Sequence, residues 1–196
     1  MCYGEHMGTK KDARPRAEGM QRYWLLKSDP EVFGFDHLLQ CEEQITGWDG
    51  VRNYQARNYL RDEMHVGDLA FFYHSCVEDP VIRGIVKIVR SGYPDDTACD
   101  PKHRYYDPRT SQGGTNPWVR VDIKVHQIFE APVLRSTLLT LPELQSMRVL
   151  QRGCRLSVQP VSSEHFERVC ALSQAKSTFP PARKKAALSF HEPERI

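Results

Sequence analysis

Aromatic, amide and basic side chains are concentrated between residues 47 and 75 of this 196-residue chain. Apolar or aromatic residues recur at positions 56, 59, 60 and 64, a spacing typical of one helix face, and Asn53 stands where such a helix would be capped. A helix N-terminus offers unpaired N–H groups and the positive end of the helix dipole. The loop of residues 48–52 is therefore predicted to form the lip of a site for an anion or a carbonyl-rich base.

A second set of polar side chains follows the apolar run at residues 69–73, which is predicted to be a buried strand. Tyr73, His74 and Ser75 stand at its end, where a rigid scaffold could aim them into a pocket floor. The alternative is that Tyr73 is simply a core residue and His74 a hydrogen-bonded one. His74 and Ser75 should point to opposite faces of the strand and so should not form a nucleophile and base, whereas a pair of Ser28 with His74 stays open.

The sequence carries few signs of enzyme chemistry. It has no glycine-rich nucleotide motif, no phosphate-binding Gly-Lys-Ser/Thr motif, no His-Glu-x-x-His and no Gly-x-Ser-x-Gly. Its six cysteines include no Cys-x-x-Cys pair, so we expect free thiols, no metal site and no cofactor.

Charge and hydropathy indicate the cellular compartment and the kind of partner to expect. No apolar run approaches the roughly 20 residues of a membrane helix, and the N-terminus lacks the apolar stretch of a secretory signal. We therefore expect an intracellular protein without a membrane contact. Residues 1–22 carry five Lys/Arg against three Asp/Glu and residues 175–196 carry five against two, whereas residues 23–174 carry 17 against 20. The folded part is thus not expected to bind a duplex by charge alone.

The remaining pattern predicts the elements that must position these side chains. Strands are expected at 23–27, 69–73, 81–89, 119–125 and 155–159, with short helices at 35–41 capped by Asp36, after Asn53, after Pro142 and after Ser162. Gly84 indicates either a bulge or a close approach to a ligand. Residues 92–117 are expected to form a long loop whose Tyr105, Tyr106 and Asp107 could cover a pocket. Without regular βαβ alternation, this pattern favours an α+β domain with a mostly antiparallel, barrel-like sheet.

Several of these segments together resemble the EVE domain of the thymocyte nuclear protein family. The most specific is the Trp-Asp-Gly-Val-Arg-Asn-Tyr-Gln-Ala-Arg-Asn block at residues 48–58, and the others are residues 23–30, 71–75, 93–95, 106–108 and 155–160. The resemblance covers residues 22–172. It implies a PUA-like pseudo-barrel flanked by helices, related to YTH and ASCH domains. Because residues 1–21 and 175–196 lack apolar periodicity, we expect them to be disordered tails around a domain at 22–174. Asp29 departs from the glutamate usual in the family.

The resemblance also implies a site and a function. The implied role is recognition of a modified base, such as a modified cytosine or adenine, in DNA or RNA, without catalysis. The expected base-binding pocket consists of Trp24, Lys27, Ser28, Trp48, Val51, Asn53, Tyr54, Tyr73, His74 and Ser75. Its expected rim consists of Arg52, Gly84, Tyr106, Asp107 and Trp118.

Two other functions remain as alternatives to a reader of modified bases. The first is an enzyme that acts on a modified nucleotide-like small molecule, with His74 as its acid or base. The second is a protein-interaction module that uses its tails. We expect a monomer whose partner is nucleic acid, nuclear in a eukaryote and cytoplasmic in a bacterium.

Overall fold

The computed structural model describes residues 21–110 and 115–174, so the two predicted tails lie outside the described residues apart from residue 21. Its centre is a six-stranded sheet with the strand order β2-β5-β4-β3-β1-β6. The strands are β1 (Tyr23–Ser28), β2 (Ile45–Trp48), β3 (Leu69–His74), β4 (Val81–Pro94), β5 (Val119–Leu134) and β6 (Val158–Val161). Only the β1–β3 pair of this sheet is parallel, which confirms the α+β class with a mostly antiparallel sheet.

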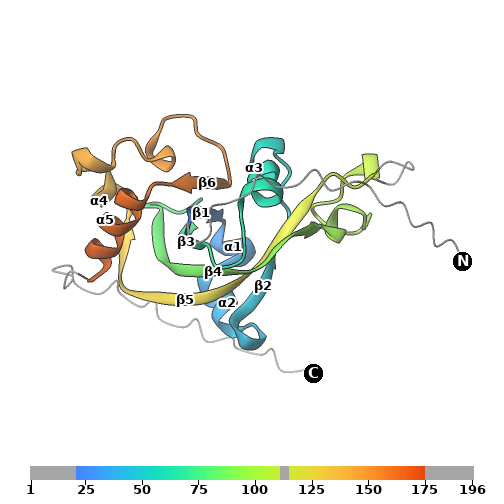
Figure 1. Ribbon diagram of the computed structural model, residues 1–196, viewed down its shortest axis with the longest axis horizontal. Helices are drawn as coiled ribbons and strands as arrows, with labels where there is room; N and C mark the ends of the chain where they lie inside the picture. Colours follow the sequence, from blue (N-terminus) through green and yellow to red (C-terminus); the bar gives the residue numbers. More distant parts are fainter. Residues whose placement is uncertain (1–20, 111–114, 175–196) are drawn as a thin grey trace, which may run out of the picture.

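The helices are short except for the last one. They are α1 (Pro30–Phe33), α2 (Phe35–Gln40), α3 (Tyr54–Asn58), α4 (Arg135–Leu139) and α5 (Ser163–Gln174). A π-helical turn, Tyr59–Glu63, continues α3. Short 3-10 turns lie at Glu42–Gln44, Asp96–Ala98, Pro108–Thr110, Pro142–Leu144 and Arg148–Leu150. In Figure 1, α1 and α2 lie within the curve of the long strands β4 and β5, and α4 and α5 lie at the other end of these strands.

The sheet separates two apolar cores, because side chains alternate along each strand. Ala70 and Phe72 of β3 belong to the core that contains Trp48 and α3, whereas Phe71 and Tyr73 belong to the core beneath α5. Tyr73 is therefore far from solvent on the α5 side, and burial raises its pKa to about 12.

Some predicted boundaries were wrong. The helix at α2 is capped by Gly34 and not by Asp36, whose exposed carboxylate lies 3.6 Å from the Arg83 guanidinium. The last strand is shifted toward the C-terminus, and β4 and β5 are longer than predicted because β-bulges let them continue through polar residues. Asp29 caps a short helix that the sequence did not reveal.

Gly84 resolves the choice that the sequence left open. A β-carbon there would lie 2.4 Å from the Gln127 carbonyl oxygen and 2.8 Å from the Phe35 ring. The register of the β4–β5 pair also shifts next to it. Gly84 thus allows β5 and α2 to approach β4 closely. Its expected place at the rim of a site stays a prediction.

A buried ion pair holds two loops together at the end of the sheet. The Arg52 guanidinium lies 2.7 Å from the Asp95 carboxylate and also donates to the Tyr105 carbonyl and the Thr97 hydroxyl. Asp95 is fully buried and accepts a further hydrogen bond from the Gly50 N–H at 3.0 Å. Burial favours the neutral acid, but these hydrogen bonds outweigh it and lower the pKa of Asp95. The pair therefore fixes residues 48–52 against residues 95–105.

Asn53→Ala is expected to cost about 1 kcal/mol of unfolding free energy, because the Asn53 side-chain oxygen accepts hydrogen bonds from the N–H groups of Gln55 and Ala56. Asn53→Asp keeps an acceptor and serves as the control. Urea unfolding measures both variants. An equal loss for the two variants would contradict a capping role.

Arg52→Ala is expected to cost about 3 kcal/mol at neutral pH, because it leaves a buried carboxylate without its cation. Since the pKa of Asp95 is lowered in the folded state, its stabilising contribution is present at neutral pH and is lost as the pH falls below about 4. The deficit of the variant should therefore shrink in acid. Urea titrations at several pH values check this, with Arg61→Ala, which breaks an exposed ion pair with Asp62, as the control. A deficit that is constant with pH would argue against the pair.

Candidate functional site

A cavity of about 470 Å³ opens beside the two loops that Arg52 and Asp95 hold together. Its volume is within the range of small-ligand sites, roughly 300–1,000 Å³. We call it the Trp48 cavity. Its lining comes from the end of β1, from α1, from β2 with the loop after it, and from residues 103–105. The lining residues are Lys27, Ser28, Asp29, Val32, Phe33, Thr46, Gly47, Trp48, Asp49, Gly50, Val51, His103, Arg104, Tyr105 and Ser157.

Three aromatic residues contribute to the walls of the Trp48 cavity. The Trp48 ring is only 7% exposed and stands edge-on to Phe72, with ring centroids 5.4 Å apart. Phe33 is half-buried, and its ring tilts against the same Phe72. Tyr105 lies so close to Gly50 that a β-carbon there would meet its ring at 2.4 Å, and Gly50 has φ +72°. Glycine at position 50 is thus required both by the backbone and by the tyrosine wall.

The polar groups of the cavity differ in how they are satisfied. The Ser28 hydroxyl donates to the Phe33 carbonyl, and Asp29 accepts from the Glu31 N–H. Lys27 and Arg104 have no ion-pair partner among the residues that the structure describes. Burial and the nearby Asp95 carboxylate raise the pKa of Asp49. The cavity therefore offers open cationic and carboxyl groups beside aromatic walls.

Four of the ten predicted pocket residues line this cavity: Lys27, Ser28, Trp48 and Val51. Phe33 and Asp49 also line the cavity but were not predicted as site residues, although Asp49 stands inside the motif at residues 48–58. Tyr105 had been expected only as part of a covering loop. The signal that could have revealed Phe33 is the helix start at Asp29-Pro30-Glu31, with aspartate as the cap and proline at the first helical position.

The other predicted pocket residues have structural positions. The Trp24 ring is 1% exposed, and its N–H donates to Asp68 at 3.0 Å. Tyr73 lies on the opposite face of the sheet, because side chains alternate along β3. The oxygen of Asn53 is used by the helix cap. The predicted inclusion of these three side chains in the lining is therefore corrected.

His74 and Ser75 support neighbouring backbone instead of lining the Trp48 cavity. His74 Nε2 accepts from the Phe35 N–H at 2.9 Å, and burial lowers the pKa of His74. The Ser75 hydroxyl donates to the Ser28 carbonyl at 3.1 Å. Ser28 and His74 are partners in the β1–β3 register, but the Ser28 hydroxyl donates to Phe33. The geometry therefore does not form the Ser28–His74 pair that was left open.

Tyr54 and three of the predicted rim residues form a separate cluster next to the cavity. The Tyr54 ring stacks on Trp118 with centroids 5.0 Å apart, and the Arg52 guanidinium lies 5.4 Å from the Trp118 ring. The Trp118 N–H donates to Asp107 at 2.7 Å, and hydrogen bonds from Arg109 and Trp118 lower the pKa of Asp107. This cluster braces the loop that carries Tyr105.

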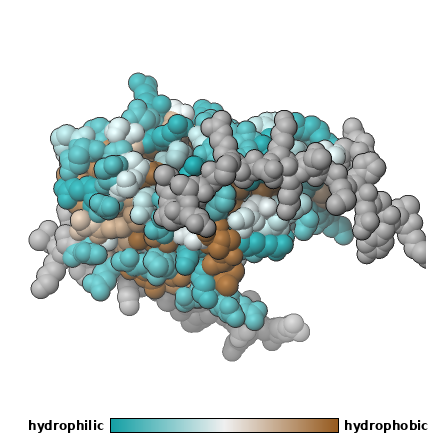
Figure 2. All heavy atoms as spheres, viewed as in Figure 1, coloured by the Kyte–Doolittle hydropathy of each residue, from teal (hydrophilic) through white to brown (hydrophobic). Residues whose placement is uncertain are grey.

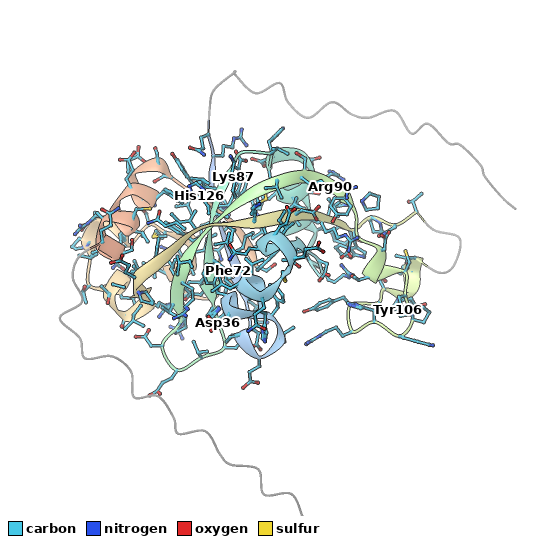
Figure 3. The ribbon with its side chains drawn as sticks, turned by 90° about the horizontal axis from the view of Figure 1, so that it is seen from below. Asp36, Phe72, Lys87, Arg90, Tyr106 and His126 are labelled. Atoms are coloured by element: carbon cyan, nitrogen blue, oxygen red, sulfur yellow. The ribbon has the colours of Figure 1, made fainter. Side chains whose placement is uncertain are left out.

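Tyr106 lies on the same braced loop. Figure 3 shows this loop projecting from one end of the molecule, with Tyr106 on it and Phe72 at the centre of the sheet. Tyr106 does not line the Trp48 cavity, whereas its neighbour Tyr105 does.

The described residues show no sign of a metal site or a membrane span. Among residues 21–110 and 115–174, no group of three or more His, Cys, Asp or Glu side chains could hold a metal ion. The five cysteines in these ranges are free thiols. No helix there is long and apolar enough to cross a membrane. Figure 2 shows a face that is mostly hydrophilic, with hydrophobic residues gathered toward its lower middle.

Comparisons with known proteins cover most of the chain. The chain is 34% identical to human thymocyte nuclear protein 1 over 87% of its own length and 86% of that protein. It is 40% identical to the zebrafish (Danio rerio) protein of the same name over 76% of its length and 71% of that protein.

Solved structures show the same fold. A structure of human THYN1 protein in complex with DNA containing 5-methylcytosine has a TM-score of 0.74 and 36% identity, covering 80% of this chain and 100% of that one. A protein from Pseudomonas syringae has a TM-score of 0.71 and 43% identity, covering 77% and 99%. The EVE domain model matches residues 22–172. This chain therefore belongs to the EVE domain family.

Proposed function

We propose that this chain is a binding protein for DNA that carries 5-methylcytosine, and that the methylated base leaves its stack to enter the Trp48 cavity. The observation that carries the proposal is the likeness to human THYN1 protein, whose structure was solved with DNA containing 5-methylcytosine. The cavity supports it with aromatic walls, open polar groups and a suitable volume.

The energetics of such binding fit the composition of the cavity. Extruding a base costs a few kcal/mol, and stacking on an aromatic side chain returns about 1–3 kcal/mol per base. Trp48, Phe33 and Tyr105 offer that stacking surface. Affinity is thus proposed to come mainly from one base.

The 5-methyl group is proposed to contact the apolar part of the wall. Val51 is 3% exposed and belongs with Trp48 both to the cavity lining and to the same apolar core, so it offers an apolar surface to a methyl group. Burying one methyl group contributes about 0.8 kcal/mol, which corresponds to a preference for methylated over plain cytosine of roughly fourfold.

Phosphate contacts are proposed to be few and local. Residues 23–174 carry 17 Lys/Arg against 20 Asp/Glu, so the domain as a whole does not attract a polyanion. Lys27 and Arg104 lie in the cavity lining without ion pairs among the described residues, and they are suited to phosphates on either side of an extruded base.

An enzymatic role has less support. The proposed acid or base, His74, is engaged with the Phe35 N–H and is not among the cavity residues. We therefore propose binding without catalysis. The monomeric state and the nuclear or cytoplasmic location stay predictions.

Phe33→Ala and Tyr105→Ala are each expected to weaken binding to a 5-methylcytosine oligonucleotide by about 1–3 kcal/mol, because each removes a stacking surface. Both side chains are partly exposed, so the variants should fold. Fluorescence anisotropy with duplexes that differ in a single methyl group measures the effect.

Leu139→Ala is the control, since Leu139 is 41% exposed, lies in α4 and is outside the cavity lining. It should keep the preference for the methylated strand. If the unaltered protein binds methylated and plain DNA equally, the proposed function is wrong; stronger binding to methylated RNA would change the partner.

A further inference from the structure

Asp49 and Asp95 are neighbouring carboxylates with opposite environments. Asp95 accepts hydrogen bonds from the N–H groups of Gly50 and Thr97, from the Arg52 guanidinium and from the Thr97 hydroxyl. No hydrogen bond donor reaches the Asp49 carboxylate within the described ranges, although Asp49 is part of the cavity lining. Asp49 is therefore the carboxyl group that is open to a ligand.

The charged groups near Asp49 do not stabilise its ionised form enough to compensate for the missing hydrogen bond donor. Burial and Asp95 disfavour its ionised form more than His103, Arg120 and Arg52 favour it, so that the pKa of Asp49 is raised. A partly buried carboxyl group without a partner reduces stability, and such groups are typical of functional sites.

The position of Asp49 relates it to the proposed aromatic wall. It directly follows Trp48 in the chain and directly precedes Gly50, whose N–H is bound to Asp95. The backbone on both sides of Asp49 is thus fixed by the Trp48–Phe72 contact and by the buried ion pair. A base that enters the Trp48 cavity would therefore meet a carboxyl group carried by a rigidly held backbone segment.

We infer that Asp49 selects cytosine over thymine by accepting a hydrogen bond from the exocyclic amino group of the extruded base. This inference rests on the proposed function. Thymine carries the same 5-methyl group as 5-methylcytosine, so an apolar wall cannot separate the two bases. They differ at position 4, where cytosine has an amino donor and thymine a carbonyl acceptor. A carboxylate oxygen satisfies the first and repels the second, which gives discrimination against the wrong base.

The test uses three duplexes that differ in one base opposite the same guanine: 5-methylcytosine, cytosine or thymine. A mismatched thymine is extruded at lower cost than a paired base, so a preference for 5-methylcytosine must come from the cavity. The unaltered protein is expected to prefer 5-methylcytosine over thymine by about tenfold or more. Asp49→Ala should reduce this ratio to one or below, because the mismatched thymine is extruded at lower cost and the group that opposes it is gone. Asp49→Asn should reverse it, because an amide can rotate to donate to the thymine carbonyl.

Controls separate this inference from a folding effect and from the proposed function. Asp36→Asn changes an exposed carboxylate outside the cavity and should keep the original ratio. Because the pKa of Asp49 is raised, Asp49→Asn should melt at a higher temperature at neutral pH, and this gain should disappear in acid.

If Asp49→Ala and Asp49→Asn keep the original ratio between 5-methylcytosine and thymine, the inference is wrong and the proposed function stands. If the unaltered protein does not prefer 5-methylcytosine over cytosine, the proposed function fails and this inference fails with it.

Discussion

The buried pair of Arg52 and Asp95 is the interaction on which the site depends. Its members are 43 residues apart in the sequence: Arg52 lies between β2 and α3, and Asp95 lies between β4 and the 3-10 turn Asp96–Ala98. A fully buried carboxylate requires a cation and hydrogen bonds, so the two loops can pack only in the arrangement that supplies them. That arrangement places Tyr105 over Gly50 and brings Trp48 into the cavity wall. Removing the pair would therefore release a wall of the cavity, not only a surface contact.

The two faces of the sheet explain why so many polar and aromatic residues of the motif regions are structural. Alternation along β3 sends Phe72 and His74 toward the side of Trp48 and α2, and sends Phe71 and Tyr73 toward α5. His74 then completes the hydrogen bonding of the α2 start, and Tyr73 fills an apolar core. Residues that are adjacent in a motif thus serve different cores.

The acidic side chains around the cavity differ in how their hydrogen-bonding capacity is satisfied. Asp68, Asp95 and Asp107 all accept hydrogen bonds within the fold. Asp49 lies among these networks but has no donor of its own in the described part of the chain. A fold that satisfies three buried carboxylates and leaves the partly buried Asp49 open keeps it at a cost in stability, which is reasonable where a ligand supplies the missing donor.

Sequence alone determined the features that depend on local pattern. The Asn53 cap, the strands β1 and β3, the mostly antiparallel sheet and the family follow from spacing and motif, since these depend on neighbouring residues. It could not assign side chains to the cavity. Whether Trp24, Tyr73 or Trp48 faces the cavity depends on which elements cover each face of the sheet. Phe33 and Tyr105 are 72 residues apart in the sequence, and both line the cavity only because the tertiary structure brings α1 and the braced loop together. Asp49 has an open carboxyl group partly for the same reason, because the donors of Gly50 and Arg52, together with the neighbouring Thr97, bind Asp95 and not Asp49.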